Sequence, residues 1–298
     1  MYSYSVIIPH KNSQKLLQRL LDSIPRRDDL QIIVVDDNSD PEKVDFNNFP
    51  GLNDTHVELY FDKTSKGAGH ARNVGLEHAK GKWLVFADAD DYFYSNAFSV
   101  IDNKIKEMNY DIIYFYCNSR NSETGVLLND RVTSIKDGIV NRDYDKLRYM
   151  SYVPWGKVVK HDLIKKNNLR FEEVEASNDI MFSTLAGYYS QSIGIIEDAL
   201  YCCTWTKGSL VSAPTLKRIK TRIIVTERVN DFLSGIGKLN YRVDAIDYVF
   251  FFFPRNLILF LWAIWRCRYK DDWIGYTKVI CIRLFLTVRK RVTKHPNE

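Results

Sequence analysis

The chain has 298 residues, enough for one large α/β domain and an appendage. With 45% hydrophobic and 27% charged residues, its composition excludes a largely disordered protein. The net charge of +5 is unevenly distributed. Residues 1–213 carry 25 basic and 30 acidic side chains, a net charge of −5, whereas residues 214–298 carry 17 and 7, a net charge of +10. We therefore predict a globular domain over 1–213 and a basic, apolar helical tail over 214–298.

The cysteine and histidine patterns exclude several kinds of site. The five cysteines form no Cys-x-x-Cys pair, and an odd, scattered set is typical of a reducing compartment without disulfides. The six histidines lack the spacing of a zinc site. Residues 1–4 lead directly into an apolar run, which leaves no room for a signal peptide. We therefore expect the domain to face the cytoplasm.

Short apolar runs that end in polar residues recur along the first 90 residues. Their lengths are typical of buried parallel strands, and they comprise Ser5–Ile8, Gln31–Val35 and Trp83–Ala87. After the first run, the apolar side chains have helical spacing: Leu16, Leu17, Leu20, Leu21 and Ile24. Asp40 and Pro41, after the second, resemble an N-cap and a first helical residue. This alternation predicts βαβ units, in which the strands' carboxyl ends gather on one edge.

Three carboxylates follow the run that begins at Trp83. Asp88, Asp90 and Asp91 repel one another unless a cation lies among them, so the cluster predicts a divalent metal site. Alternatively, they form an acidic turn that caps the next helix.

Four blocks of the chain resemble glycosyltransferases of family 2. They have the family's order and spacing: Ser5–Asn12, Val34–Asp40, Gly67–Gly75 and Trp83–Asp91. A weaker match continues through Pro154–Lys157 to Asn178–Phe182. The resemblance implies a GT-A fold, an α/β fold with a Rossmann-like, mostly parallel sheet flanked by helices. To this we add a C-terminal helical extension. Beyond about residue 213 we find no diagnostic match.

The resemblance also implies a nucleotide-diphosphate sugar as donor. The loop from Pro9 to Asn12 would lie against the base and ribose. Asp37 resembles the carboxylate that reads the base, and it could accept the N3–H of uracil or thymine; UDP is preferred and dTDP remains open. Asp36 would brace the loop.

The glycine-containing block adds a phosphate site to this prediction. Arg72 is a forked cation suited to phosphate, and a helix from about Ala68 would point its positive end at an anion. Gly67, Gly69 and Gly75 would let the backbone approach the ligand, and we assign Lys66 to donor binding as well. Alternatively, the glycines form a turn and Arg72 makes a surface salt bridge.

Mg²⁺ or Mn²⁺ is the expected cofactor, because carboxylate and phosphate oxygens are hard ligands. By resemblance Asp90 is the direct ligand. Asp88 is a further metal or ribose contact, facing the ribose or a metal-bound water. Asp91 alternatively begins the next helix.

Asp179 matches the family's catalytic base, a carboxylate on a later helix. With Ser177 or Asn178 as N-cap, Asp179 would lie in the first turn and remain ionised; alternatively, it only stabilises the helix end. Many relatives carry Glu where this chain has Asn178. A base at this place implies inversion at the anomeric carbon. Trp155 would pack beside a sugar or in the core, and Lys157 would contact phosphate or acceptor.

The tail suits a membrane surface. Two apolar runs, Tyr248–Phe253 and Leu257–Trp265, together approach the length of a membrane span. Pro254 interrupts them, however, and Arg255 would cost about 2.5–3.5 kcal/mol in a bilayer. Apolar and basic residues then alternate at helical spacing between residues 274 and 294. We expect peripheral contact with the inner face of the cell membrane and no nucleic-acid binding, because aromatic and basic residues do not alternate there. Alternatively, the tail packs on the domain.

The leading hypothesis is an inverting, metal-dependent transferase. It would move one sugar from a nucleotide donor to a hydroxyl of a saccharide or lipid-linked saccharide in surface glycan synthesis. A sugar-nucleotide pyrophosphorylase would need an Arg-bearing, Gly-rich loop where Pro9–Asn12 lies. A non-catalytic nucleotide-sugar binding module is the third hypothesis.

Overall fold

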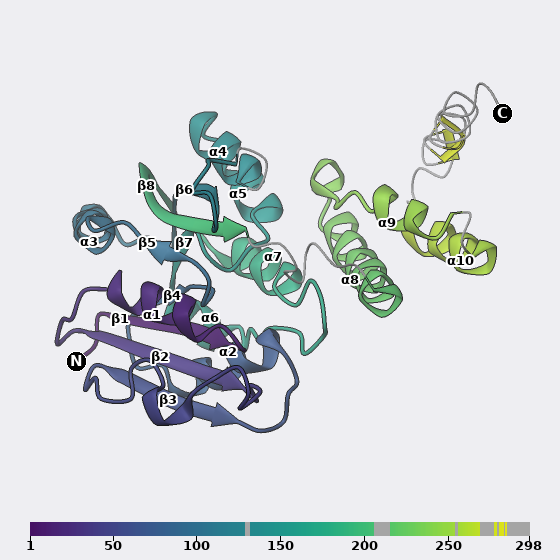
Figure 1. Ribbon diagram of the computed structural model, residues 1–298. Coiled ribbons are helices and arrows are strands. Elements are labelled where there is room, and N and C mark those ends of the chain that lie inside the picture. The colour runs from purple at the N-terminus through teal and green to yellow at the C-terminus, as the bar shows by residue number, and fades with distance from the viewer. Residues whose placement is uncertain are drawn as a thin grey trace. The chain divides into compact units, whose positions relative to one another are not determined.

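The computed structural model describes residues 1–128, 132–205, 215–253, 256–268, 277–278, 280–282 and 284. The chain divides into two compact units, Met1–Pro214 and Thr215–Glu298 (Figure 1). Each unit has its own hydrophobic core.

The first unit is built on one eight-stranded sheet with the order β3-β2-β1-β4-β7-β6-β8-β5. The strands are β1 (Tyr4–His10), β2 (Leu30–Asp37), β3 (Val57–Asp62), β4 (Trp83–Phe86), β5 (Tyr92–Phe93), β6 (Ile112–Asn121), β7 (Lys157–Lys160) and β8 (Ile193–Trp205). Strands β1, β2, β3 and β4 are parallel to one another, and β6 is parallel to β8. Only β7 and β5 run the other way. The predicted α/β class with a mostly parallel sheet is confirmed.

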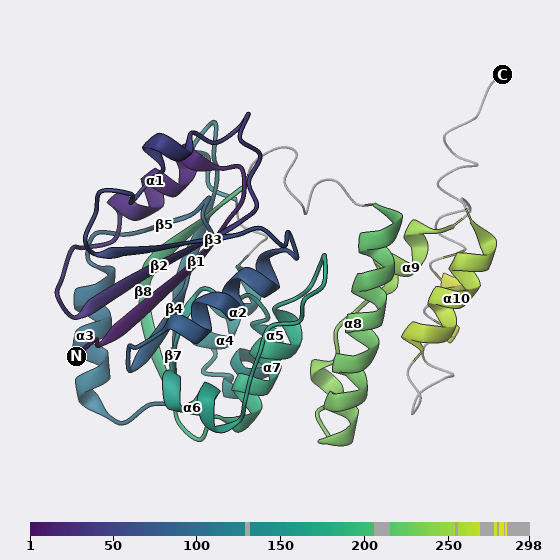
Figure 2. The ribbon, with the colours of Figure 1, turned by 90° about the horizontal axis from the view of Figure 1, so that it is seen from below.

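Helices cover both faces of this sheet. They are α1 (Gln14–Asp22), α2 (Ala68–His78), α3 (Ala97–Glu107), α4 (Thr133–Val140), α5 (Tyr144–Met150), α6 (His161–Lys166) and α7 (Ile180–Tyr189), with the 3₁₀ turn η1 (Phe46–Asn48). Along the sheet, the connection from β1 to β2 moves toward the β3 edge, whereas the connection from β3 to β4 moves back past β2 and β1. Since such crossovers are right-handed, α1 and α2 lie on opposite faces (Figure 2). The predicted inner face of α1 is buried at Leu17, Leu20 and Leu21.

Asp40 and Pro41 do not begin a helix, so that prediction was wrong. The carboxylate of Asp40 accepts the backbone N–H of Glu42, and its carbonyl accepts those of Lys43 and Val44. The segment therefore closes as a turn and leads to η1, and the chain reaches β3 without an intervening α-helix.

The second unit is helical, as expected for the extension. It contains α8 (Leu216–Gly235), the 3₁₀ turn η2 (Leu239–Tyr241), α9 (Ile246–Phe251) and α10 (Leu257–Cys267). Ile223, Val249 and Ala263 are fully buried between these helices. Among the helices described here, none has the length and apolar character needed to cross a bilayer. Pro254, Arg255 and most of the predicted basic helix between 274 and 294 lie outside the described residues.

Candidate active site at the carboxyl edge of the sheet

Strand directions bring the predicted site residues to one edge of the sheet. The carboxyl ends of β1, β2 and β4 are neighbours there, with His10 opposite Asp36 and Ile7 opposite Phe86. Strand β7 is antiparallel to β4, so its first residue, Lys157, lies at this same edge. The acidic loop after β4, residues 87–91, therefore faces the loops that follow β1 and β2.

Asp36 braces the loop after β2, as predicted. His10 Nδ1 lies 2.7 Å from one of its carboxylate oxygens, and the N–H and hydroxyl of Ser39 donate to the carboxylate at 2.9 and 2.5 Å. Burial alone would raise the pKa of Asp36, but the hydrogen bonds from His10 and Ser39 outweigh it and hold this pKa below its usual value. Asp36 is therefore a structural carboxylate.

Asp37 joins three segments of the chain. It is nearly inaccessible, and its two oxygens accept hydrogen bonds from Lys11 Nζ and from the backbone N–H of Gly67, each at 2.9 Å. It thus connects the end of β2 to the loop after β1 and to the start of α2. Here its carboxylate is occupied by protein donors.

Pro9 and Asn12 both have structural contacts within the protein. Pro9 is buried within β1, opposite Val35. Asn12 has a left-handed backbone, with φ of 57°; its N–H donates to Ser39 Oγ and its side-chain oxygen accepts from the N–H of Asp40, both at 2.8 Å. The two loops are thereby held together. Donor contacts by Pro9 and Asn12 remain predictions.

The glycines around α2 serve packing more than ligand access. A Cβ on Gly69 would lie 2.1 Å from the carbonyl oxygen of Glu172, and one on Gly75 would lie 2.4 Å from an Ile7 methyl group. These two glycines are therefore required for packing, and their approach to a ligand stays a prediction. Gly67 has a φ of 93° and open space around it. Lys66 is half exposed, with its Nζ 3.9 Å from a Glu173 carboxylate oxygen.

Arg72 is the central connection of the site. It is 5% exposed, which excludes the alternative of a surface salt bridge. Its guanidinium donates to Asp88 Oδ1 at 2.6 Å and to Asn178 Oδ1 at 2.8 Å, and it lies 5.3 Å from the centre of the Phe171 ring. Its two terminal nitrogens each make one of these bonds, a use suited to a forked cation. Arg72 thereby ties the acidic loop after β4 to the segment that leads into α7.

Asp179 is the N-cap residue of α7, so the assignment of Ser177 or Asn178 to that position was wrong. Its side chain makes no capping hydrogen bond. Burial raises the pKa of Asp179, and the negative charge of Asp88 adds to this, whereas the charges of Arg72 and Lys157 oppose it. The pKa of Asp179 therefore lies above its usual value, because desolvation outweighs the favourable helix end, and the ionised state of Asp179 stays a prediction. A carboxylate with a raised pKa is a stronger base.

Lys157 and Trp155 are both buried at this edge. The Nζ of Lys157 donates to the carbonyl oxygen of Ser151 at 2.8 Å and lies 5.5 Å from the Tyr114 ring centre. Burial lowers the pKa of Lys157 to about 7. Trp155 stacks on Tyr201, with ring centres 5.7 Å apart. Trp155 thus takes the core position that the sequence left open.

A network around Tyr201, missed from the sequence, fixes the acidic loop. The Tyr201 hydroxyl accepts the N–H of Asp88 at 3.0 Å and donates to Asp91 Oδ2 at 2.7 Å. The N–H of Thr204 donates to the other oxygen of Asp91 at 2.7 Å. The carbonyl oxygen of Asp90 accepts hydrogen bonds from Arg19 and Thr204. Asp91 therefore anchors the loop to β8 and does not begin α3.

The pKa of Asp91 is affected by the other carboxylates of this loop. Burial raises its pKa well above the usual value, and the negative charges of Asp90 and then Asp88 raise it further. Within the described parts of the chain, no three His, Cys, Asp or Glu side chains are grouped to hold a metal by themselves. A cation at this loop would accordingly need ligands beyond the protein, such as the oxygens of a diphosphate.

Replacing Tyr201 tests this network. We expect Tyr201→Phe to lower the free energy of unfolding by about 1–3 kcal/mol, because Asp88 and Asp91 each lose a buried partner. Tyr114→Phe is the matched control, since the Tyr114 hydroxyl is equally buried and has no hydrogen-bond partner among the described residues. It should be neutral or stabilising. Urea denaturation of both variants measures the difference, and equal losses would contradict the assignment.

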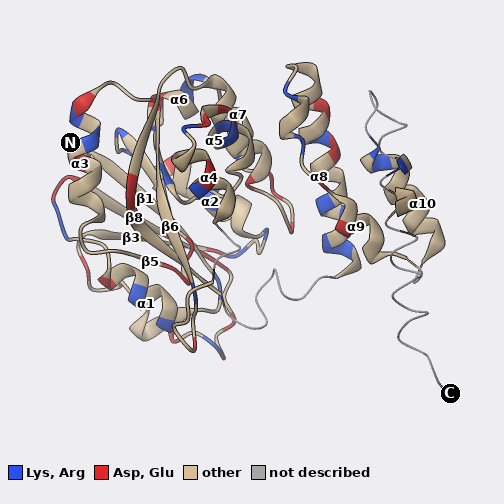
Figure 3. Ribbon diagram, turned by 90° about the horizontal axis from the view of Figure 1, so that it is seen from above, with Lys and Arg blue, Asp and Glu red and all other residues tan. Residues whose placement is uncertain are grey.

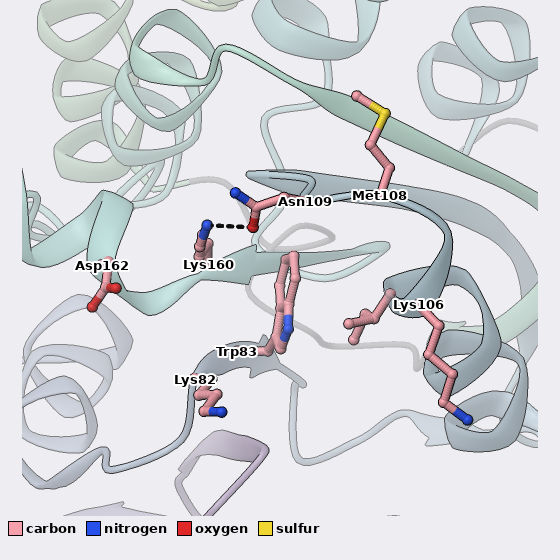
Figure 4. A pocket seen from close by; sticks show the side chains of 8 residues that line it. Lys82, Trp83, Lys106, Met108, Asn109, Lys160 and Asp162 are labelled. Atoms are coloured by element: carbon pink, nitrogen blue, oxygen red, sulfur yellow. Dashed lines mark hydrogen bonds between the residues drawn. The ribbon is translucent and has the colours of Figure 1, made fainter.

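A cavity lies at the opposite edge of the sheet. Its volume is about 490 Å³, and it is lined by Lys82, Trp83, Ile105, Lys106, Met108, Asn109, Lys160 and Asp162 (Figure 4). In it Lys160 Nζ donates to Asn109 Oδ1 at 2.7 Å. Trp83 begins β4 and Lys160 ends β7, whereas the acidic loop follows the other end of β4. This cavity is therefore separate from the candidate site.

The sheet and its carboxyl edge have the arrangement of the GT-A fold class. The crystal structure of S. aureus TarS (1-349) in complex with UDP-GlcNAc is similar to this chain, with a TM-score of 0.65. The match covers 93% of this chain and 79% of that one at 21% sequence identity, and it shows the fold. The family model for glycosyl transferase family 2 matches residues 5–166. The chain belongs to this family, as its four blocks predicted.

Two relatives have described acceptors. The poly(ribitol-phosphate) beta-N-acetylglucosaminyltransferase TarS of Staphylococcus aureus (strain MW2) is 26% identical over 223 residues, 72% of this chain and 37% of that protein. The poly(ribitol-phosphate) beta-glucosyltransferase of Bacillus spizizenii is 29% identical over 205 residues, 66% of this chain and 31% of that protein. The match thus spans about a third of the length of each.

Proposed function

We propose that this chain is an inverting glycosyltransferase. It transfers a single sugar from a nucleotide-diphosphate donor, a UDP-sugar, to a hydroxyl of a saccharide or lipid-linked saccharide in surface glycan synthesis. One observation carries the proposal: Arg72 bridges Asp88 of the acidic loop and Asn178, the residue before Asp179. The predicted donor end and the predicted base are thereby held in one site. The relatives that act on poly(ribitol-phosphate) make a polyol-phosphate polymer a second acceptor class to test.

The donor would bind along the loops after β1 and β2. Asp37 is assigned to the uracil, on the family's pattern; its present bonds to Lys11 and Gly67 would have to be shared or exchanged as the base binds. Arg72 would contribute positive charge beside the diphosphate while it remains bonded to Asp88. Lys66, half exposed just before α2, can reach the same region.

The acidic loop fits a divalent cation shared with the diphosphate. Asp90, with Asp88, would hold Mg²⁺ or Mn²⁺, since these ions bind few protein carboxylates and take phosphate oxygens as well. Burial and then the negative charges of Asp90 and Asp88 raise the pKa of Asp91, and a bound cation would relieve the repulsion between these carboxylates. When bound, the ion neutralises charge on the departing nucleoside diphosphate. Tyr201 and Thr204 hold the loop in place.

Asp179 would take the proton of the acceptor hydroxyl. Its raised pKa makes it a better base than an exposed aspartate, and the charges of Arg72 and Lys157 oppose the rise. Attack by the activated hydroxyl from the face opposite the leaving group inverts the anomeric carbon in a single displacement. This scheme needs no covalent intermediate on the protein.

Thermal unfolding with candidate donors tests the proposal. UDP-hexoses and UDP-N-acetylhexosamines, each with Mn²⁺ or Mg²⁺, are compared with the metal alone. A ligand that binds only the native state at one hundred times its Kd should stabilise it by about 2.7 kcal/mol, a shift of several degrees. If no nucleotide sugar raises the unfolding temperature with either metal, the proposed function is wrong.

A further inference from the structure

Helix α10 of the second unit has two apolar faces. Phe260, Ala263 and Cys267 pack into the core of that unit. We call the opposite side the outer face of α10; it consists of Leu257, Ile258, Leu261 and Trp265, with exposed fractions of 59%, 81%, 57% and 56%. At about 100° per residue, these four residues share one arc of the helix. Helix α10 contains no acidic residue, and Figure 3 shows no red on it.

An outer face of this kind is unusual for a surface helix. Surface helices normally place polar residues opposite their buried stripe, and isolated exposed apolar residues need no explanation. Here four large side chains are contiguous on a helix of 11 residues. Such a patch indicates an interaction surface.

The charge around the outer face indicates what it binds. Residues 214–298 carry a net charge of +10. At the end of the face, the Arg268 guanidinium lies 4.3 Å from the centre of the Trp265 ring. An interfacial Trp with a neighbouring Arg suits the boundary between headgroups and acyl chains. The same face of a second copy would bring the same positive charge and be repelled, whereas an anionic lipid surface would be attracted.

We propose that the outer face of α10 inserts into the interface of an anionic membrane. The helix lies in the plane of the surface, since 11 residues are too few to span the hydrocarbon core. Leu257, Ile258 and Leu261 enter the acyl boundary, and the basic residues of the unit contact the headgroups. This contact is independent of the transferase chemistry and would hold the first unit near membrane-bound acceptors.

Vesicle co-sedimentation of the full chain tests this inference. Wild type should bind vesicles of phosphatidylcholine with phosphatidylglycerol, bind pure phosphatidylcholine weakly, and be released as salt is raised. Ile258→Glu should weaken partitioning about tenfold or more, because it removes an inserted apolar group and adds a repelled charge. The matched control is Val140→Glu at the end of α4, where the side chain is 60% exposed; it should bind as wild type does.

Three results would overturn the inference. Wild type could fail to bind the anionic vesicles, or Ile258→Glu could bind them as well as Val140→Glu does. Light scattering could instead show that wild type is dimeric and Ile258→Glu monomeric, which would make the outer face a self-association surface. Circular dichroism and donor-dependent thermal shift of Ile258→Glu serve as folding controls, and both should match wild type.

Discussion

Asp179→Asn should lower kcat by about 10²- to 10⁴-fold, the usual contribution of a general base, while the Kd for the donor changes little. The amide keeps the size of the side chain at the N-cap of α7 but cannot accept the acceptor's proton. Release of UDP in the presence of acceptor measures kcat, and calorimetry measures donor affinity. A non-catalytic binding module would show no turnover in wild type.

The pKa of Asp179 adds a second readout to this variant. The pKa of Asp179 is higher in the folded than in the unfolded state. At pH values between these two pKa values the native state binds more protons than the unfolded state, so the free energy of unfolding falls as pH rises through this range. Above this range the ionised carboxylate is a destabilising group, so Asp179→Asn should unfold no more easily than wild type there. In wild type, kcat/KM should fall on the acid side at a higher pH than for an ordinary aspartate. A variant with both weaker folding and weaker donor binding would assign Asp179 a structural role instead.

Arg72→Lys should lower kcat/KM for the donor by about tenfold, and Arg72→Met by about 10²-fold or more. Lysine keeps the charge but cannot bond Asp88 and Asn178 as a fork, and methionine leaves both oxygens without this partner. Since the charge of Arg72 lowers the pKa of Asp179, the acid limb of the pH profile should move to higher pH in Arg72→Met. Initial rates across pH measure both effects.

Arg170→Met is the control for these variants. Arg170 is a surface cation whose Nη1 lies 3.2 Å from a Glu77 carboxylate oxygen, with both side chains about half exposed. Exposed pairs contribute about 0–1 kcal/mol, so this variant should keep near wild-type rates and the wild-type pH profile. If Arg72→Met lost activity without moving the acid limb, Arg72 would act on the fold or the donor and not on Asp179.

The local parts of the site were predictable from the sequence. Short apolar runs in the sequence show where strands end, and parallel pairing brings those ends together. Asp36, Asp37 and the acidic loop could therefore be placed at one edge of the sheet. The bracing role of Asp36 also followed from its position in the loop. The family blocks then supplied the order of the elements and the GT-A fold.

What could not be predicted depends on contacts between distant segments. Tyr201 and Asp91 are 110 positions apart and have no shared local pattern. Lys157 reaches the site edge only because β7 is antiparallel to β4. The pKa of Asp179 depends on burial, which a helix-start argument does not contain. Gly69 looked like a ligand-facing glycine, and only the fold shows Glu172 against it.

The most direct test of the account is calorimetric titration of UDP in the presence of Mn²⁺. We predict binding to wild type and to Asp179→Asn with similar Kd, loss of most affinity when Mn²⁺ is removed, and a comparable loss in Asp90→Asn. Binding of UDP that is indifferent to Mn²⁺ and to Asp90, or no binding to wild type at all, would contradict a donor site at the carboxyl edge of this sheet.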